Sequence, residues 1–315
     1  MLAAAAGPAC TTAACVLWLI GLAHAYLLWD GDILVSYALC GLFLFLFRRA
    51  RPGRLLISGL MLLIIGSALS WLGGWSAQYW PPESLAEFRS QWVPSDERLA
   101  EEIAAMRGGW LSEFTQRVPG VLMIHLFYLP FQLIWRAGGC MLLGMALYRW
   151  GWFSGKRNHK LYGTLIAVGL LLGLPLTAFG VHSQMAAKWE PVFAFFQASL
   201  FGYWGSLPLA LAWIGLVMLM YRSQLWPALT RGLAAVGRMA LTNYLLQTGI
   251  CTTLFYGHGL GLFGRVDRLG QAGIVLVVWI VQLAISPRWL RYFRFGPAEW
   301  LWRSLSYRRR QPFRI

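Results

Sequence analysis

A histidine and two aspartates near the start of the chain are the strongest candidates for chemistry: His24, Asp30 and Asp32. A neutral imidazole can take a proton from a hydroxyl or an amine, or can itself be acylated, because its ordinary pKa of about 6.5 lies close to working pH. The two carboxylates could orient the imidazole or hold a cationic acceptor. The structural alternatives are a histidine bonded to a neighbouring helix and an Asp32 that caps a helix starting at Ile33. We predict all three as catalytic residues.

A second polar set lies further along the chain, at His125, Gln132 and Arg136. On an α-helix that turns about 100° per residue, these spacings place the three side chains within about 40° of one face. An arginine inside a membrane span costs about 2.5–3.5 kcal/mol on insertion scales and indicates a functional site. We predict that the set binds substrate. The alternative is an arginine that pairs with Asp30 or with helix carbonyls for packing.

A third polar face is predicted near the C-terminal end, where Asn243, Gln247 and Cys251 follow at intervals of four with Tyr244 beside them. Such a stripe commonly makes hydrogen bonds between helices, and it could also line a substrate path. Arg238 precedes it and either anchors at lipid headgroups or binds a phosphate at the start of the helix. We predict Arg238, Asn243, Tyr244 and Gln247 as substrate-binding residues.

Composition decides which elements carry these residues. Of the 315 residues 58% are hydrophobic and 12% are charged, half the charged fraction of a soluble domain, so the chain must be solvated mainly by lipid. Long apolar runs without alternation predict helices that cross a bilayer. We expect an all-α, polytopic membrane helix bundle with about eight transmembrane helices, at roughly 14–29, 33–47, 55–75, 121–149, 161–181, 191–220, 233–256 and 272–290.

The charges predict the orientation. Basic residues outnumber acidic ones by 27 to 12, which gives a net charge of +15, and they gather in loops that fall on one side if there are eight crossings: 48–54, 156–160, 222–231 and 288–314. Retention of cations on the cytoplasmic face explains this excess without nucleic acid. We therefore predict cytoplasmic N and C termini, with the bilayer and anionic lipid headgroups as partners. The sequence does not indicate an oligomeric state.

The chain is expected to form one integral membrane domain over 1–315. The hydrophilic segment 76–118 is predicted as an extracytoplasmic amphipathic insert with a helix at about 95–117, serving either as a connector or as a lid over a site. The basic, tryptophan-rich tail 295–315 is predicted to lie on the cytoplasmic surface. Its lone acid, Glu299, is expected to pair with Arg294 or Arg303.

Familiar catalytic and metal-binding motifs are missing. The five cysteines are scattered without a Cys-x-x-Cys pair, which supports neither a disulfide framework nor a metal site. The chain has no Walker loop, His-Glu-x-x-His motif or Gly-x-Ser-x-Gly elbow. An ATP-driven pump, a zinc protease and a serine hydrolase of these types are disfavoured. No bound metal or cofactor is predicted.

Three stretches carry a resemblance to a known family: 21–34 (GLAHAYLLWDGDIL), 237–247 (GRMALTNYLLQ) and 291–303 (RYFRFGPAEWLWR). In order and spacing they resemble the YeiB-type family of bacterial inner-membrane proteins, a domain of unknown function. Members of that family usually begin with additional helices and an Asp-x-x-Arg-Gly motif, and nothing here corresponds to them. The family's N-terminal helices are therefore expected to be missing. We interpret Met1–Ala14 as the start of a retained membrane helix in preference to a signal peptide.

The resemblance also implies a function. The YeiB-type family is distantly similar to transmembrane acyltransferases of the heparan-glucosaminide N-acetyltransferase type. It implies a multi-pass protein of the bacterial inner membrane that moves an acyl group from a cytoplasmic thioester donor to an extracytoplasmic acceptor. Acyl-CoA would then be a donor substrate that approaches near Arg238, while His24 activates the acceptor. A transporter or permease of a small solute and a non-catalytic membrane partner stay open as alternatives.

Overall fold

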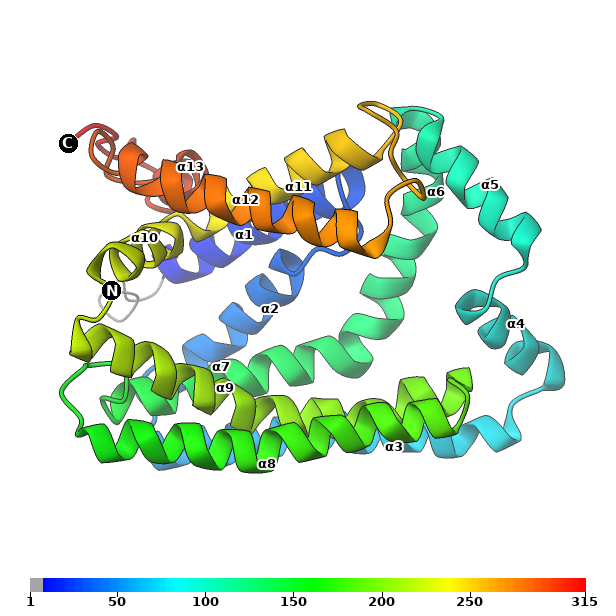
Figure 1. Cartoon of the computed structure of the whole chain (residues 1–315), viewed down its shortest axis with the longest axis horizontal. Helices are drawn as coiled ribbons and strands as arrows, with labels where there is room; N and C mark the ends of the chain where they lie inside the picture. The colour runs from blue at the N-terminus through cyan, green and yellow to red at the C-terminus, as the bar shows by residue number, and fades with distance from the viewer. Residues whose placement is uncertain (1–7) are drawn as a thin grey trace. The chain divides into compact units, whose positions relative to one another are not determined.

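The chain folds into helices, as a computed structural model of residues 8–315 shows (Figure 1). Within this described part no β-strand forms, and a single isolated bridge joins Phe293 to Arg314. The all-α prediction is confirmed. Residues 1–7, which belong to the predicted retained helix, lie outside the described residues.

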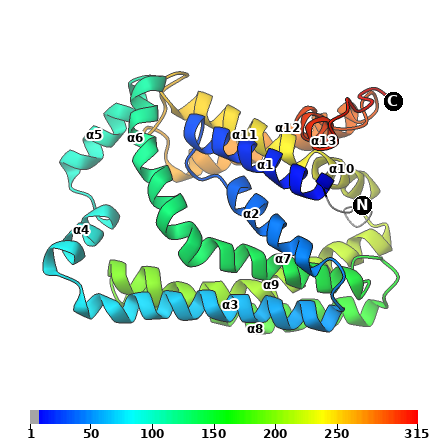
Figure 2. The same ribbon diagram turned by 180° about the vertical axis from the view of Figure 1, so that it is seen from behind.

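The chain divides into two compact units, and the first comprises residues up to Arg48, Asp96–Tyr128 and Pro227–Ile315. In this unit α1 and α11 lie side by side in both views (Figure 1, Figure 2). Its elements are α1 (Pro8–Leu27), α2 (Leu34–Leu44), η1 (Phe45–Phe47), α5 (Asp96–Arg107), α6 (Trp110–Met123), α10 (Pro227–Arg238), α11 (Ala240–Phe255), α12 (Arg268–Trp289) and α13 (Pro297–Ser306).

The second unit comprises Arg49–Ser95 and Leu129–Trp226. Its elements are α3 (Pro52–Ser76), η2 (Ala77–Tyr79), α4 (Pro82–Trp92), α7 (Ile134–Arg149), α8 (His159–Ala186), η4 (Phe193–Ala198) and α9 (Ser199–Ser223). The segment η3 (Ile124–Leu133) runs from the first unit into the second and is a π-helix, as is η4.

Five described helical segments are long and apolar enough to cross a membrane: Pro52–Tyr79, Trp110–Arg149, His159–Ala186, Phe193–Ser223 and Arg268–Trp289. Thr11–Leu27 and Leu34–Phe47 are shorter apolar helices. These segments indicate a membrane protein. They do not establish the predicted count of eight crossings.

Two predicted helices are divided in the structure. The predicted span 233–256 is interrupted at Met239, whose backbone leaves the helical region, so that α10 and α11 are separate helices. The amphipathic helix expected over 95–117 is α5 followed by the start of α6. Between them Gly109 has a φ of +106°, a conformation that side chains other than glycine rarely adopt, so the chain turns there.

Glycines allow α8 and α9 to approach closely in the second unit, where the two helices run side by side (Figure 1, Figure 2). A Cβ on Gly169 would meet the Pro208 carbonyl and, at 2.7 Å, the Ala212 Cβ. A Cβ on Gly173 would lie 2.9 Å from the Gly205 carbonyl oxygen. Small residues at such crossings provide the van der Waals packing that holds helices together in lipid.

This contact yields a stability prediction with a control in the same helix. Replacing Gly169 by Ile should destabilise the protein by about 1–3 kcal/mol, because the side chain has no room against α9. Gly163→Ile is the matched control, since a Cβ there meets nothing within 4 Å. Thermal unfolding of the two purified variants in the same detergent tests the packing. Equal midpoints would contradict it.

Candidate functional site

A hydrogen-bonded relay joins three buried side chains from distant parts of the chain. His24 lies near the end of α1 and is 2% exposed. Its Nδ1 is 2.8 Å from Oδ1 of Asp32, and its Nε2 is 2.9 Å from Oγ1 of Thr248 on α11. The ring is therefore buried but bonded at both nitrogens to polar groups, as an imidazole that handles protons requires.

Asp32 has three donors, and they come from three elements. Its Oδ1 accepts from His24 and from the Tyr244 hydroxyl, at 2.8 and 3.2 Å. Its Oδ2 accepts the Val35 N–H at 2.9 Å, at the start of α2. The orienting and the helix-capping interpretations of Asp32 therefore both describe contacts that exist, because the carboxylate uses one oxygen for each.

The two ring nitrogens of His24 have different partners, a carboxylate and a hydroxyl. With Asp32 ionised, Nδ1 carries the proton and donates it to the carboxylate, so Nε2 has the free lone pair. The Thr248 hydroxyl oxygen lies 2.9 Å from that nitrogen and 3.4 Å from the Tyr244 carbonyl oxygen, to which it donates. Carboxylate, imidazole and hydroxyl in this order form the arrangement that activates a nucleophile, in which the carboxylate fixes the tautomer and the imidazole removes a proton.

A close approach of α1 to the beginning of α2 positions the carboxylate. A Cβ on Gly21 would lie 2.7 Å from the Val35 nitrogen and 3.0 Å from Asp32 Oδ2. The absence of a side chain there lets the loop before α2 reach α1 one turn before His24. The short segment between α1 and α2 lets the two helices pack against each other, which is the local reason that Asp32 faces His24.

Asp30, the other predicted carboxylate, is not part of the relay. It is half-buried, and Oδ2 lies 3.9 Å from where a Cβ of Gly120 on α6 would be. Burial and then the Asp30 charge raise the pKa of the Tyr256 hydroxyl in the loop after α11. Asp30 therefore faces α6 and this loop, and its catalytic role stays a prediction.

The third polar face binds a neighbouring helix. Asn243 Nδ2 donates to Ser286 Oγ at 3.2 Å, and Gln247 Nε2 donates to Gln282 Oε1 at 2.8 Å. Gln282 Nε2 in turn donates to the Asn243 carbonyl oxygen at 3.0 Å. These bonds join α11 to α12, which supports the interhelical interpretation. Tyr244, the residue after Asn243, instead donates its hydroxyl to Asp32 of the relay.

The start of α11 is occupied by a carboxylate of this chain. Glu299 accepts from the Thr242 N–H at 3.0 Å and from its hydroxyl at 2.5 Å. The expected pairing of Glu299 with an arginine of the tail is therefore wrong, because unpaired N–H groups and the helix dipole attract the acid instead. Arg238 donates to the Arg294 carbonyl at 3.3 Å, and its predicted substrate contact stays a prediction.

The predicted face of the fourth span does not form as expected. His125 and Gln132 lie in the π-helix η3, which contains Pro130, so the spacing calculated for an α-helix does not apply. The His125 ring lies 5.9 Å from the Tyr26 ring in the first unit. Gln132 lies in the second unit.

Arg136, also in the second unit, binds the neighbouring helix α9. It donates to the Tyr203 carbonyl at 2.6 Å and to Ser206 Oγ at 2.5 Å. Its guanidinium also lies over the Tyr203 ring, 4.3 Å from the centroid. These contacts support the packing alternative for Arg136, and its predicted contact with substrate stays a prediction.

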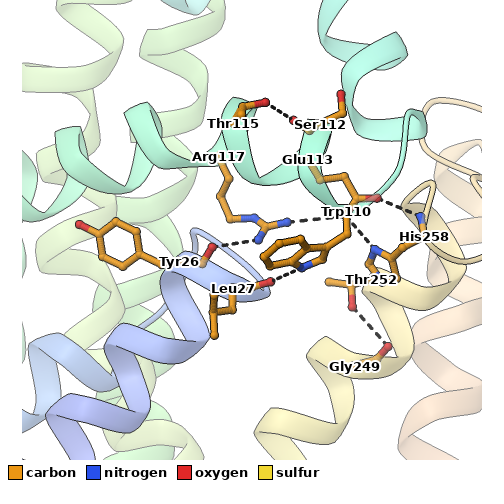
Figure 3. Close-up of polar contacts among 10 residues, drawn as sticks. All are labelled: Tyr26, Leu27, Trp110, Ser112, Glu113, Thr115, Arg117, Gly249, Thr252 and His258. Atoms are coloured by element: carbon orange, nitrogen blue, oxygen red, sulfur yellow. Dashed lines mark hydrogen bonds and ion pairs between the residues drawn. The ribbon is translucent and has the colours of Figure 1, made fainter.

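A buried charged cluster at α6 was not anticipated from the sequence. Glu113 is 0% exposed and lies 2.7 Å from Nδ1 of His258, while Arg117 is 2% exposed and donates to the Tyr26 carbonyl at 3.2 Å (Figure 3). The available signal was the spacing of Glu113 and Arg117 by four residues, one helical turn. Their segment was interpreted as surface. Among residues 8–315 no three His, Cys, Asp or Glu side chains gather as metal ligands.

Comparison with known proteins places the chain in a family. The family described as "Protein of unknown function (DUF418)" matches residues 147–309. "Uncharacterized protein YeiB" of Escherichia coli (strain K12) is 37% identical over 308 residues, covering 94% of this chain and 75% of that protein. "Uncharacterized protein YxaH" of Bacillus subtilis (strain 168) is 32% identical over 317 residues, covering 94% and 71%. The chain belongs to the YeiB-type DUF418 family. No solved structure matches it.

Family membership confirms the resemblance carried by the three sequence stretches. Two of those stretches contribute to the site. The first contains His24 and Asp32 of the relay, and the second contains Tyr244, whose hydroxyl donates to Asp32. The third contains Glu299, which holds the start of α11. The similarity to acyltransferases and the inner-membrane location stay predictions, because the relatives are themselves uncharacterised.

A stability measurement can separate the two contributions of Asp32, its helix-capping bond to Val35 and its bonds to His24 and Tyr244. Asp32→Asn keeps an oxygen for the Val35 N–H but offers His24 and Tyr244 a weaker partner, so it should destabilise by about 1–3 kcal/mol. Asp267→Asn is the matched control, because Asp267 makes the equivalent bond to Gly270 at the start of α12 and asparagine caps equally well. Chemical or thermal unfolding of both variants measures the difference. A control as damaging as Asp32→Asn would show that the relay adds nothing.

Proposed function

We propose that this protein is a membrane-bound acyltransferase in which His24 is the general base. The observation that carries the proposal is the Asp32–His24–Thr248 relay. It leaves Nε2 as the basic atom, directed at a hydroxyl. The donor would be a cytoplasmic acyl thioester such as acyl-CoA, and the acceptor a hydroxyl or amine that reaches His24 from the predicted outer side.

The proposed step balances without a metal or a redox partner. The acceptor oxygen or nitrogen attacks the thioester carbonyl carbon, and His24 Nε2 takes the acceptor's proton. The carbon–sulfur bond then breaks, and the imidazolium returns the proton to the departing thiolate. Asp32 stabilises the imidazolium formed in between and keeps the ring oriented. The Thr248 hydroxyl marks the direction in which the acceptor's O–H or N–H would lie.

Burial of the relay suits this chemistry. His24, Asp32 and Thr248 are 2%, 5% and 6% exposed. Exclusion of water strengthens each electrostatic contact and protects an activated thioester from hydrolysis. The polar face of Asn243 and Gln247 gives less support to a transport path, because those amides are bonded to Gln282 and Ser286 on α12.

Replacing the base provides the test. His24→Gln should lower acyl transfer at least about 100-fold, the contribution typical of a general base. His182→Gln, an exposed histidine on α8, is the matched control and should transfer at the wild-type rate. Each protein is reconstituted in liposomes that enclose a bacterial envelope extract, and isotope-labelled acetyl-CoA or longer acyl-CoA is added outside.

Incorporation of label into the enclosed extract is the measurement, and a normal thermal midpoint shows that a variant is folded. Transfer by His24→Gln at the wild-type rate would contradict the role of His24. Failure of the wild-type protein to transfer label to any component would contradict the acyltransferase proposal as a whole.

A further inference from the structure

The second cluster of buried charges lies in the first unit, next to the relay. We call it the Arg117 cluster: Tyr26 at the end of α1, Glu113 and Arg117 on α6, and His258 and Tyr256 after α11. Figure 3 shows the first four of these residues. The proposed transfer reaction does not use these side chains. Their contacts show which charges are satisfied and which are not.

Glu113 is fully committed to His258. One carboxylate oxygen accepts the His258 backbone N–H at 3.0 Å, and the other lies 2.7 Å from the ring Nδ1. The nearest guanidinium nitrogen of Arg117 is 3.8 Å from this carboxylate, beyond hydrogen-bond distance. Glu113 therefore balances part of the Arg117 charge but receives none of its N–H groups.

Arg117 has buried donors that the protein does not use. Of its five N–H groups one is engaged, in the bond to the Tyr26 carbonyl, and Nε is buried without a hydrogen-bond partner. The side chain is 1% exposed. The Arg117 guanidinium also lies 5.8 Å from the centroid of the Tyr256 ring, a contact that uses none of its N–H groups. Arg303 has an unpartnered Nε as well, but its side chain is only half-buried. A buried guanidinium in this state is costly unless an acceptor reaches it.

The position of Arg117 ties it to the relay. The carbonyl that it binds belongs to Tyr26, two residues after His24 on the same turn of α1. Arg117 and His24 are therefore both held at the last turn of α1. The cluster also reaches the surface of the protein, because the His258 side chain is 29% exposed.

We propose that Arg117 binds a phosphate group of the molecule that reaches His24. Guanidinium groups bind phosphate through parallel N–H bonds, and Arg117 has the free donors for them. Phosphate offers several oxygens that can accept such parallel N–H bonds at the same time. A lipid headgroup and a soluble phosphate ester offer the same group. Describing this molecule as the acyl acceptor rests on the proposed function, whereas phosphate binding at Arg117 does not.

The test measures binding by stability, with the full chain in phosphatidylcholine nanodiscs. Inorganic phosphate, against chloride at equal ionic strength, should raise the thermal midpoint of the wild-type protein by several degrees and that of Arg117→Gln by none. Replacing part of the lipid by phosphatidylglycerol provides the second arm. A rise only in that arm would assign the phosphate to a lipid headgroup and supports the proposal equally.

Further variants protect the test against misfolding. Arg117→Lys keeps the charge but not the parallel donors, and it should respond more weakly than wild type. Arg107→Gln is the control: Arg107 is a neighbouring arginine whose Nε donates to the Phe263 carbonyl at 2.8 Å, and this variant should respond like wild type. Glu113→Gln removes an opposing charge and should respond at lower phosphate concentration than wild type.

The two proposals can fail independently. His24→Gln should lose acyl transfer but keep the full phosphate response, because His24 makes no contact with Arg117. Equal responses of wild type and Arg117→Gln in both arms would overturn the phosphate site and leave the role of His24 untouched. So would an equal loss of response in Arg107→Gln, which would show that the response is not specific to Arg117.

Discussion

The carboxylate of Asp32 holds the first unit together at the point where its chemistry lies. It accepts from His24 on α1, from Val35 at the start of α2 and from Tyr244 on α11. A buried anion is tolerated only with such donors, so the three elements must keep their relative positions for the charge to stay satisfied. The close approach at Gly21 is what lets the loop deliver this carboxylate to the end of α1.

The helix α11 is held from two sides and at its start. One face bonds to α12 through its amides, and the other presents Tyr244 and Thr248 to α1. At its start Glu299 of α13 accepts from Thr242, and Trp302 of α13 donates to the Ala13 carbonyl of α1. The helix α13 thus bonds to both α1 and α11 at a second place, away from His24, and this contact helps to fix the distance between the two helices. A relay on elements held this way keeps its geometry without adjusting to each substrate.

The sequence predicted the local features and missed the long-range ones. Long apolar runs predicted the helices, and the short distance in sequence between His24 and Asp32 placed both in one candidate site. Thr248, 224 residues from His24, could not be assigned to it, because nothing local indicates which face of α11 meets α1. The π-helix around Pro130 changed the rotation per residue, which a calculation for an α-helix cannot anticipate. Glu113 and Arg117 resembled a surface pair because their burial depends on the loop carrying His258.

The polar groups that pack helices differ in their hydrogen-bond partners from those that are available for chemistry. The side-chain amides of Asn243 and Gln247 on α11 bond to α12, and the amide of Gln282 on α12 bonds back to α11. These amides therefore hold the two helices together. The Nε2 of His24 is bonded to a hydroxyl, a partner that an acceptor's own O–H can replace at little cost in free energy. The Nε of Arg117 differs from both, because it is buried and has no hydrogen-bond partner. In lipid, water cannot satisfy a buried donor. A bound substrate would therefore replace Thr248 as the partner of His24 Nε2 and supply the acceptor that the Arg117 donors lack.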